Sequence, residues 1–469
     1  MNTREIVLDT LLALEQEGAY SHRLVKAVLD KYNYLEARDK AFIKRLTEGT
    51  LERQLELDYY LDQYSSVPVK KMKPLIRSVL RMGVYQILYM DSVPDSAVCN
   101  EACKMTAKRG FRNLKGFVNA VLRTVSKGKN ALPLPDSRRE PVKYLSVRYS
   151  MPQWLVELWR GEYGDEITVT ILKGLLEVRP VSLRFSTRIS GEEREEILAR
   201  LRDRGVRLTQ SPCLPYVFLM EHADGVAGLP GFREGMYIVQ DVSSALAVEA
   251  AGIRETDFVV DVCCAPGGKS ILAAEKAGKG RVLARDVSEE KAALTVENIG
   301  RMGIENIEVQ VFDGTERDEA LLGKADVVLL DVPCSGLGVM GKKRDIKYRV
   351  TAEGIQELEA LQKQIVRACA GYVKPGGTLL YSTCTIQSGE NEAMVRLITR
   401  ELGFEPVSLA GILPEAVLAG KRKLEEALEK AGRSPAVSLE QEERNACMQF
   451  LPGFTESDGF FLARFRRPE

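Results

Sequence analysis

The stretch Phe258-Val-Val-Asp-Val-Cys-Cys-Ala-Pro-Gly-Gly-Lys269 decides the fold class. Residues 258–262 are almost all β-branched or aromatic, which is typical of a buried strand. The loop 263–269 contains two adjacent glycines directly before Lys269, and the composition of 269–276 predicts a helix. A buried strand that enters a helix through a glycine-rich loop is typical of an open α/β sheet, where ligands bind beyond the carboxyl ends of the strands.

The same alternation continues toward the C-terminus. Apolar runs at 281–286, 307–313, 325–332 and 378–384 predict strands, 288–302 and 351–373 predict helices, and Lys374-Pro-Gly-Gly377 predicts a turn. These elements predict a Rossmann-like α/β domain over residues 236–467, with a mostly parallel sheet and helices on both faces. Residues 459–465 predict a late edge strand, and the highly charged segment 421–445 predicts an exposed helix or loop without chemistry.

Residues 1–127 are expected to form a separate all-α bundle, because apolar side chains recur there at three- and four-residue spacing. Met1–Gly128 contains 21 Lys and Arg against 15 Asp and Glu, a net charge of +6, although the whole chain has 66 of each. Such an excess fits either a solvated face or a phosphate-binding surface. The basic residues gather at Lys70, Lys71, Lys73, Arg77 and Arg81, and again at Lys104, Lys108, Arg109, Arg112 and Lys115.

A linker and a small module separate these two parts. Residues 128–145 contain prolines among small and charged residues and predict the linker. Residues 146–235 predict a small α+β module of ferredoxin-like or RRM-like type. Its expected elements are short strands at 181–185, 206–209 and 216–220 and a charged helix at 192–204, with a further strand at 236–240. The module shows no aromatic signature of RNA binding.

Composition excludes several classes of site. The nine cysteines are an odd number and no secretory signal is seen, so reduced thiols are expected rather than a disulfide framework. The only histidines, His22 and His222, are far apart, which argues against most zinc sites and a Ser-His-Asp triad. We expect no metal. No apolar run approaches the roughly 20 residues of a membrane span, so a soluble, cytoplasmic protein without a membrane partner is expected.

Three strand ends predict a nucleoside-containing cofactor. The glycine-rich loop follows the first strand, Asp286 closes the second, and Asp313 closes the third. The dinucleotide fingerprint and the complete phosphate-binding loop are both absent. Acids that can hold ribose and the adenine edge, next to glycines that admit close backbone approach, describe a pocket for S-adenosylmethionine.

Two cysteines follow the remaining strands, in Asp331-Val-Pro-Cys-Ser-Gly336 and in Ser382-Thr-Cys-Thr385. Carbon 5 of cytosine is too weak a nucleophile to take a methyl group from a sulfonium. A thiolate that adds to C6 makes C5 nucleophilic, and loss of the C5 proton then releases the thiolate. Asp331 could hold N3 or N4 of the ring as charge develops.

These motifs resemble known families. Asp261–Lys269, Asp331–Gly336, Tyr381-Ser-Thr-Cys-Thr385 and Glu390-Asn-Glu392 are similar to the Nol/Nop/Sun family of RNA 5-methylcytosine methyltransferases. Arg38-Asp-Lys-Ala-Phe42, the run from Leu80 to Tyr89, and Gly116-Phe-Val-Asn-Ala-Val-Leu-Arg123 resemble the NusB family of RNA-binding helical domains.

Together, the two resemblances imply methylation of 16S rRNA at cytosine 967, free or in an early assembly intermediate, with no obligate protein partner. They imply Cys384 as nucleophile and Cys334 in product release. The implied cofactor contacts are Cys263, Cys264, Ala265, Pro266, Gly267, Gly268, Lys269, Asp286, Asp313 and Asp331. Cys264 departs from the alanine found in many relatives.

Alternatives remain at this stage. DNA cytosine methyltransferases use the cysteine of a Pro-Cys motif, which would select Cys334. The RNA could instead be tRNA or 23S rRNA, or the chain could be a non-catalytic RNA-binding protein. An amino-group methyltransferase is disfavoured because Asp/Asn-Pro-Pro-Tyr is absent. Lys342, Lys343, Arg344 and Lys347 follow the Pro-Cys motif and fit either RNA phosphate contacts or a solvated turn.

Overall fold

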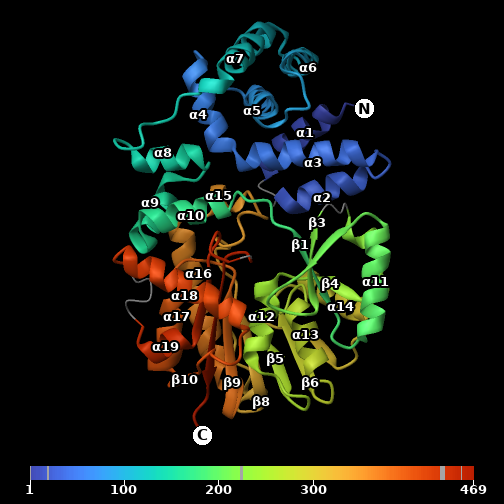
Figure 1. The fold of residues 1–469 in the computed structure, drawn as a ribbon, viewed down its shortest axis with the longest axis vertical. Helices are drawn as coiled ribbons and strands as arrows, with labels where there is room; N and C mark the ends of the chain where they lie inside the picture. The colour runs from blue at the N-terminus through green and yellow to red at the C-terminus, as the bar shows by residue number, and fades with distance from the viewer. Residues whose placement is uncertain (1, 18–20, 222–224, 434–438, 456) are drawn as a thin grey trace. The chain divides into compact units, whose positions relative to one another are not determined.

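The computed structural model describes residues 2–17, 21–221, 225–433, 439–455 and 457–469 (Figure 1). They divide into two compact units, one formed by Met1–Gly161 with Lys342–Arg349 and the other by Glu162–Gly341 with Val350–Glu469. We call them the helical unit and the catalytic unit. Of the helices within these described ranges, none is long and apolar enough to cross a membrane. His222 lies outside the described residues.

The helical unit is a bundle arranged around α5 (Pro74–Tyr89). Ten of its residues are buried, because the other helices contact it from several sides. Those helices are α1 (Thr3–Glu17), α3 (Ala37–Glu52), α4 (Gln54–Tyr64), α6 (Asp95–Lys108) and α7 (Lys115–Gly128), while α2 (Ser21–Lys31) packs on α1 and α3. The segment expected as a linker ends in α8 (Pro141–Arg148), which packs on α4. The predicted all-α architecture of this part is confirmed.

The catalytic unit begins with a small antiparallel sheet in the order β2-β3-β1-β4. Its strands are β1 (Val181–Phe185), β2 (Arg207–Gln210), β3 (Val217–Glu221) and β4 (Tyr237–Val239). Helix α10 (Asp165–Gly174) precedes this sheet, and α11 (Gly191–Asp203) starts at a capping box of Ser190 and Glu193. Strand β4 pairs with β1, so this sheet extends past residue 235.

The large sheet has the order β10-β12-β9-β8-β5-β6-β7, with β11 paired to β12. Its parallel strands are β5 (Phe258–Asp261), β6 (Arg281–Asp286), β7 (Ile307–Val311), β8 (Ala325–Asp331) and β9 (Val373–Thr383). The antiparallel strands are β10 (Glu405–Pro406), β11 (Cys447–Phe450) and β12 (Phe460–Arg466). The chain runs outward from β5 in both directions, so the topological switch point lies between β5 and β8.

Two expectations for this sheet were wrong. Residues 374–377 are not a turn, because β9 already begins at Val373. Residues 459–465 do not form an edge, because β12 pairs with β9 on one side and with β10 and β11 on the other. The side chains of Phe461, Leu462 and Phe465 are buried accordingly, as the two covered faces of an interior strand require.

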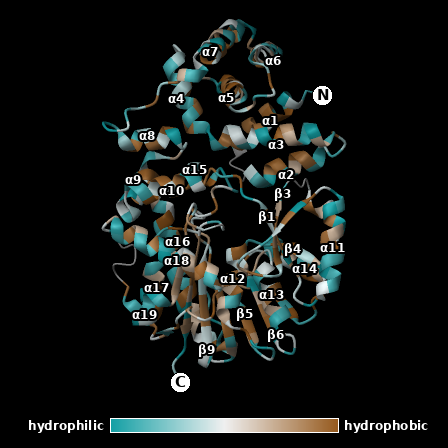
Figure 2. Cartoon of the chain, in the orientation of Figure 1, coloured by the Kyte–Doolittle hydropathy of each residue, from teal (hydrophilic) through white to brown (hydrophobic). Residues whose placement is uncertain are grey.

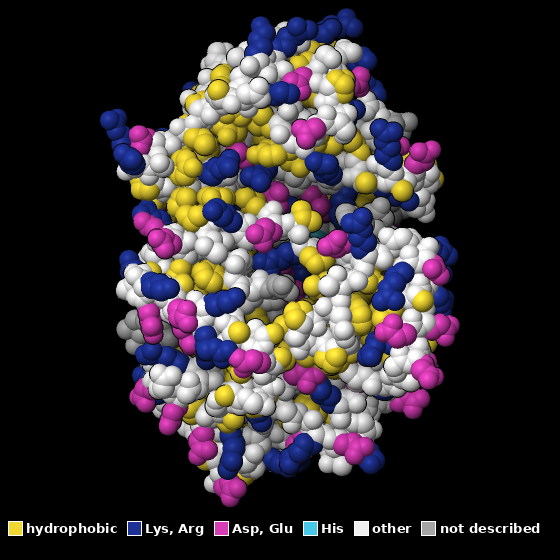
Figure 3. Space-filling model, in the orientation of Figure 1, with side chains coloured by type: hydrophobic (Ala, Val, Ile, Leu, Met, Phe, Trp, Pro, Cys, Tyr) yellow, Lys and Arg dark blue, Asp and Glu magenta, His cyan; other side chains and the backbone are white. Residues whose placement is uncertain are grey.

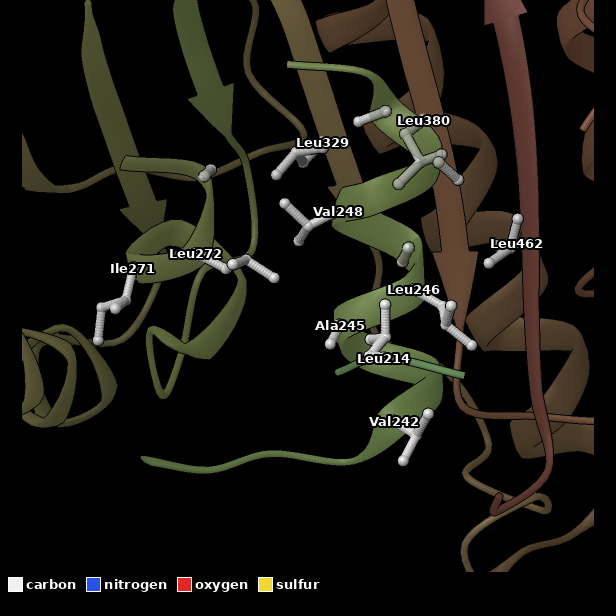
Figure 4. Close-up of a cluster of buried hydrophobic side chains, with 14 of the residues drawn as sticks. Leu214, Val242, Ala245, Leu246, Val248, Ile271, Leu272, Leu329, Leu380 and Leu462 are labelled. Carbon is white, nitrogen blue, oxygen red and sulfur yellow. The ribbon is translucent and has the colours of Figure 1, made fainter. Parts of the chain in front are cut away.

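Helices cover both faces of the large sheet, and the strands alternate their side chains between the two. One face meets α12 (Val242–Ala251), α13 (Gly268–Lys276) and α14 (Glu289–Met302). Figure 4 shows Leu246 and Val248 of α12 among Leu329, Leu380 and Leu462 of the strands. The opposite face meets α16 (Ala352–Cys369) and α17 (Glu392–Arg396) through a second buried cluster. In Figure 2 strand β5 of the large sheet is mostly brown, and helix α11 is mostly teal.

Candidate active site

The glycine-rich loop forms at the carboxyl end of β5, beside the switch point. The Cys264 N–H donates to the Arg285 carbonyl of the neighbouring strand at 2.8 Å, and the Gly267 N–H donates to the Cys264 carbonyl at 2.7 Å. Gly267 has φ +97°, and a Cβ there would lie 2.9 Å from a methyl carbon of Thr295. Glycine is required at this position for both reasons. Burial raises the pKa of Cys263 well above its ordinary value and that of Cys264 to about 12, so both remain thiols.

The acids expected to hold the nucleoside lie beyond neighbouring strands. Asp286 ends β6 and accepts the Ala265 N–H of the glycine-rich loop at 3.4 Å. Asp313 lies two residues after β7, is exposed, and accepts the Thr315 N–H at 2.9 Å. Val287, directly after Asp286, is apolar yet 62% exposed. An exposed apolar side chain beside these acids suits the base and ribose of an adenosyl group, so the residues present fit S-adenosylmethionine.

Asp261 lies at the end of β5 and opens the motif Asp261–Lys269, but the sequence alone does not predict a role for it. Its side chain is fully buried and accepts the Ser270 hydroxyl at 2.6 Å through Oδ2. Oδ1 is also buried and has no hydrogen-bond partner among the described residues. Burial raises the pKa of Asp261 to about 6.

Asp331 lies in an ion pair at the end of β8. Its Oδ2 accepts the Lys269 ammonium at 2.6 Å, and its Oδ1 accepts the Ser382 hydroxyl at 2.7 Å. Burial alone would lower the pKa of Lys269, but the charges of Asp331, Asp261 and Cys384 outweigh it and raise that pKa. A lysine of the glycine-rich loop is therefore held as an ammonium within the field of Asp331 and Cys384.

Cys334 and Cys384, which lie 50 residues apart, meet in space. Their sulfur atoms are 3.1 Å apart, and the Cys384 N–H donates to the Cys334 sulfur at 3.3 Å. The hydrogen bond with Cys384, together with burial, raises the pKa of Cys334 well above its ordinary value. All nine cysteines are free, and both of these are partly exposed. No group of three or more His, Cys, Asp and Glu in the described ranges could hold a metal ion.

The basic segment after the Pro-Cys motif belongs to the helical unit. Arg344 pairs with Glu48 at 2.6 Å and with Glu52 at 2.9 Å. The Lys347 ammonium is 4% exposed and donates to the Glu52 carbonyl at 2.7 Å. These two side chains point into their own unit, which contradicts a phosphate contact for either, while Lys342 and Lys343 are exposed. Five of the six residues at 342–347 are charged, so this segment would be expected at the surface and its burial could not be predicted.

Five of the ten residues in the two predicted basic clusters of the helical unit are also paired. Arg81 forms two hydrogen bonds with Asp58, at 2.6 Å each, and Arg77 pairs with Glu15. Lys104, Lys108 and Arg109 pair with Glu101, Glu5 and Asp9. On α7, Lys115 is followed by Arg123 after eight residues and by Lys127 after four more. These three and Arg112 are exposed and make no ion pair with a described acidic residue.

Comparison with known proteins gives three family matches. Residues 249–466 match the model described as 16S rRNA methyltransferase RsmB/F, residues 1–127 match the NusB family, and residues 151–227 match an RsmF/B-like ferredoxin-like domain. A probable ribosomal RNA small subunit methyltransferase B of Bacillus subtilis (strain 168) is 32% identical over 470 residues, covering 99% of each chain. Ribosomal RNA small subunit methyltransferase B of Proteus mirabilis (strain HI4320) is 30% identical, covering 84% of this chain and 90% of the relative.

Two solved structures share the fold. The crystal structure of PH0851 superposes with a TM-score of 0.78 at 23% identity, covering 100% of this chain and 99% of that one. The crystal structure of NSun6 from Pyrococcus horikoshii with SFG has a TM-score of 0.55 at 22% identity, covering 68% of this chain and 98% of that one. At such identities the likeness concerns the fold.

Proposed function

Because the chain belongs to the 16S rRNA methyltransferase RsmB/F family, we propose that it methylates C5 of a cytidine in 16S rRNA, cytosine 967, through a covalent bond from Cys384 to C6. The observation that carries the proposal is the pair of thiols at the carboxyl ends of β8 and β9, 3.1 Å apart. Methylation of a nitrogen needs no thiol, whereas C5 methylation needs one nucleophilic sulfur.

S-adenosylmethionine is the methyl donor in this proposal, and when bound it supplies an electrophilic methyl group to C5. The residues that would hold it are the glycine-rich loop, Asp286 and Asp313. Three features support this choice: the positive φ of Gly267, the exposed Val287 beside Asp286, and the place of the loop at the switch point. The related structure that carries SFG, an analogue of this donor, adds to the support.

Cys384, Cys334 and Asp331 have separate roles in the reaction at the cytosine ring. Cys384 adds its sulfur to C6, and the Lys269 ammonium favours the charged form of that sulfur because opposite charges attract. Cys334 is assigned to product release, the role that the resemblance to the Nol/Nop/Sun family implies. Asp331, whose carboxylate bonds to Lys269 and Ser382, would accept a hydrogen bond from the ring amino group. Once C5 carries the methyl group, a water molecule takes the C5 proton, and the electrons of that C–H bond restore the C5–C6 double bond and expel the Cys384 thiolate.

The RNA partner is supported by the exposed basic side of α7. Arg123 follows Lys115 by eight residues and Lys127 follows Arg123 by four, so all three lie on the exposed side of α7, while Val118, Leu122 and Val125 fill its buried side. Figure 3 shows basic side chains gathered over this part of the helical unit. Unpaired cations in a row fit the phosphates of an RNA strand.

Two cysteine variants test the chemistry. With rRNA and the methyl donor, Cys334→Ala should accumulate a covalent protein–RNA adduct, and Cys384→Ala should form none; an adduct that accumulates with Cys384→Ala would reverse the assignment. Bisulfite maps of rRNA from cells with and without the protein identify the nucleotide. We expect one cytosine of 16S rRNA to lose its modification. A change confined to tRNA or 23S rRNA would instead assign a different substrate.

A further inference from the structure

We propose that Glu390, with Asn391, is a positioning residue that clamps the two cysteine-bearing loops together and so fixes the separation of the reacting sulfurs. This inference rests on the proposed function, because it concerns the same pair of thiols. Both side chains are 0% exposed. Neither side chain forms a hydrogen bond with a sulfur atom of the described residues, so both act through the residues that flank the cysteines.

The Glu390 carboxylate holds the loop of Cys334. Its Oε1 accepts the Ser335 N–H at 2.8 Å and the Gln362 amide at 2.9 Å, and its Oε2 accepts the Ser335 hydroxyl. The Gln362 amide also donates to the Pro333 carbonyl at 2.9 Å. The residues immediately before and after Cys334 are therefore both tied to one carboxylate, directly or through one glutamine of α16.

The same dipeptide holds the strand of Cys384. The Thr383 hydroxyl donates to Asn391 Oδ1 at 2.6 Å, and Asn391 Nδ2 donates to the Thr385 carbonyl at 3.2 Å. The Tyr381 hydroxyl donates to the Glu390 carbonyl at 2.6 Å. The residues on both sides of Cys384 thus bond to Asn391.

One contact joins the two halves. The Ser335 and Thr385 hydroxyls lie 2.8 Å apart, and Ser335 also bonds to Glu390. This hydrogen-bonded path therefore links the Cys334 loop to the Cys384 strand through the buried side chains of Ser335, Thr385 and Glu390. A buried network with all members bonded holds a single arrangement, so the sulfurs cannot separate without breaking several hydrogen bonds.

Glu390→Ala and Glu390→Gln separate a clamp from other roles. Alanine removes all the bonds to the carboxylate. Glutamine keeps Oε1 as the acceptor and can place its amide against the Ser335 oxygen, whose proton then turns toward Thr385. A clamp is therefore broken by alanine and rescued by glutamine. The matched control is Glu443→Ala, which removes another buried, hydrogen-bonded carboxylate of the same unit.

The assay is the single-turnover rate at which the full chain forms a covalent adduct with RNA containing 5-fluorocytidine, in the presence of S-adenosylmethionine. Fluorine at C5 leaves no proton to remove, so the sulfur–C6 bond persists and can be counted on a denaturing gel. We expect Glu390→Ala to slow trapping about a hundredfold, because a displacement of the order of 1 Å costs that much. The KM values for RNA and donor should be unchanged. Glu390→Gln and Glu443→Ala should trap like the unmodified chain.

Each contrary result has one meaning. Equal trapping by Glu390→Ala and the unmodified chain would overturn the clamp, and so would a Glu390→Gln variant as slow as Glu390→Ala. Failure of the unmodified chain to trap RNA would instead refute the proposed function. If Glu390→Ala does not fold, Gln362→Met removes the donor that ties Pro333 to Glu390. It should slow trapping about tenfold, and an unchanged rate overturns the clamp.

Discussion

Replacing Lys347 with methionine should stabilise the helical unit, most strongly at and below neutral pH. The lysine side chain is 4% exposed, and its ammonium donates one recorded hydrogen bond, to the Glu52 carbonyl. Burial lowers its pKa from 10.5 to about 7, a change that Glu52 opposes and that Arg53 and Arg344 enhance. Methionine has a similar length and carries no charge, so it fills the same space without the cost of burying an ammonium.

The magnitude follows from the two pKa values. The unfolded chain holds the Lys347 proton up to about pH 10.5, whereas the folded chain releases it above about pH 7. The folded state is therefore penalised below pH 7, and stability rises with pH between about 7 and 10. At about 1.4 kcal/mol per pKa unit, the penalty at pH 7 is about 4 kcal/mol. Loss of the hydrogen bond to Glu52 removes about 1 kcal/mol of the gain, which leaves about 3 kcal/mol.

Hydrogen–deuterium exchange of peptides from α3 is the suitable assay, since a chain of two units need not unfold in one step. At pH 7 the α3 amides of Lys347→Met should exchange about a hundredfold more slowly than those of the unmodified chain, and the difference should shrink as the pH rises toward 10. Lys343→Met, which removes an exposed cation from the same segment, is the matched control and should leave exchange unchanged. Faster exchange in Lys347→Met at pH 7 would show that the buried ammonium is stabilising and would refute this reasoning.

Three further predictions concern the catalytic unit. Burial raises the pKa of Asp261 from 3.8 to about 6, so the folded state binds the extra proton and stability should fall by about 2 kcal/mol as pH rises from 4 to 6; denaturant midpoints should show this loss, and Asp261→Asn should lack it. Gly267→Ala forces an alanine to φ +97°, so calorimetry should show at least tenfold weaker binding of S-adenosylmethionine, with Gly278→Ala unchanged. Glu275→Ala removes the carboxylate paired with the fully buried Arg184, which keeps its hydrogen bond to Gln240, and should lower the free energy of unfolding by about 3 to 5 kcal/mol, measured in urea.

Most of the large sheet could be predicted, because its strands are buried on both faces and appear as continuous apolar runs. β6 (Arg281–Asp286) was predicted with its observed bounds. The C-terminal strand β12 was located, but its place in the sheet was not, since strand order depends on pairing with β9 that the local sequence does not encode. The early start of β9 was missed because glycine and proline at 375–377 are typical of turns.

The polar residues that follow the strands of the site could be predicted, but the residues that hold them in position could not. Residues after strands converge by topology alone, so the meeting of Cys334 with Cys384 followed from the order of the sheet. Gln362 carried a weaker signal: it lies on the buried side of α16 with Ile355, Val366 and Cys369, where an apolar residue is the rule. A polar side chain at such a position must find partners, and here it finds those that fix the Cys334 loop.

Burial gives the charged groups of this chain two opposite roles. Lys269 and Lys347 are both largely buried, but Lys269 lies within reach of Asp331 and Cys384, which raise its pKa, whereas the recorded hydrogen bond of Lys347 is to a carbonyl and its pKa falls. A lysine kept as an ammonium can favour a thiolate, and one that loses its proton near neutral pH cannot. Both lysines stand in motifs rich in glycine or charged residues, so the sequence alone does not distinguish them. The difference is a carboxylate within hydrogen-bond distance, which Lys269 has and which supports the role proposed for it beside Cys384.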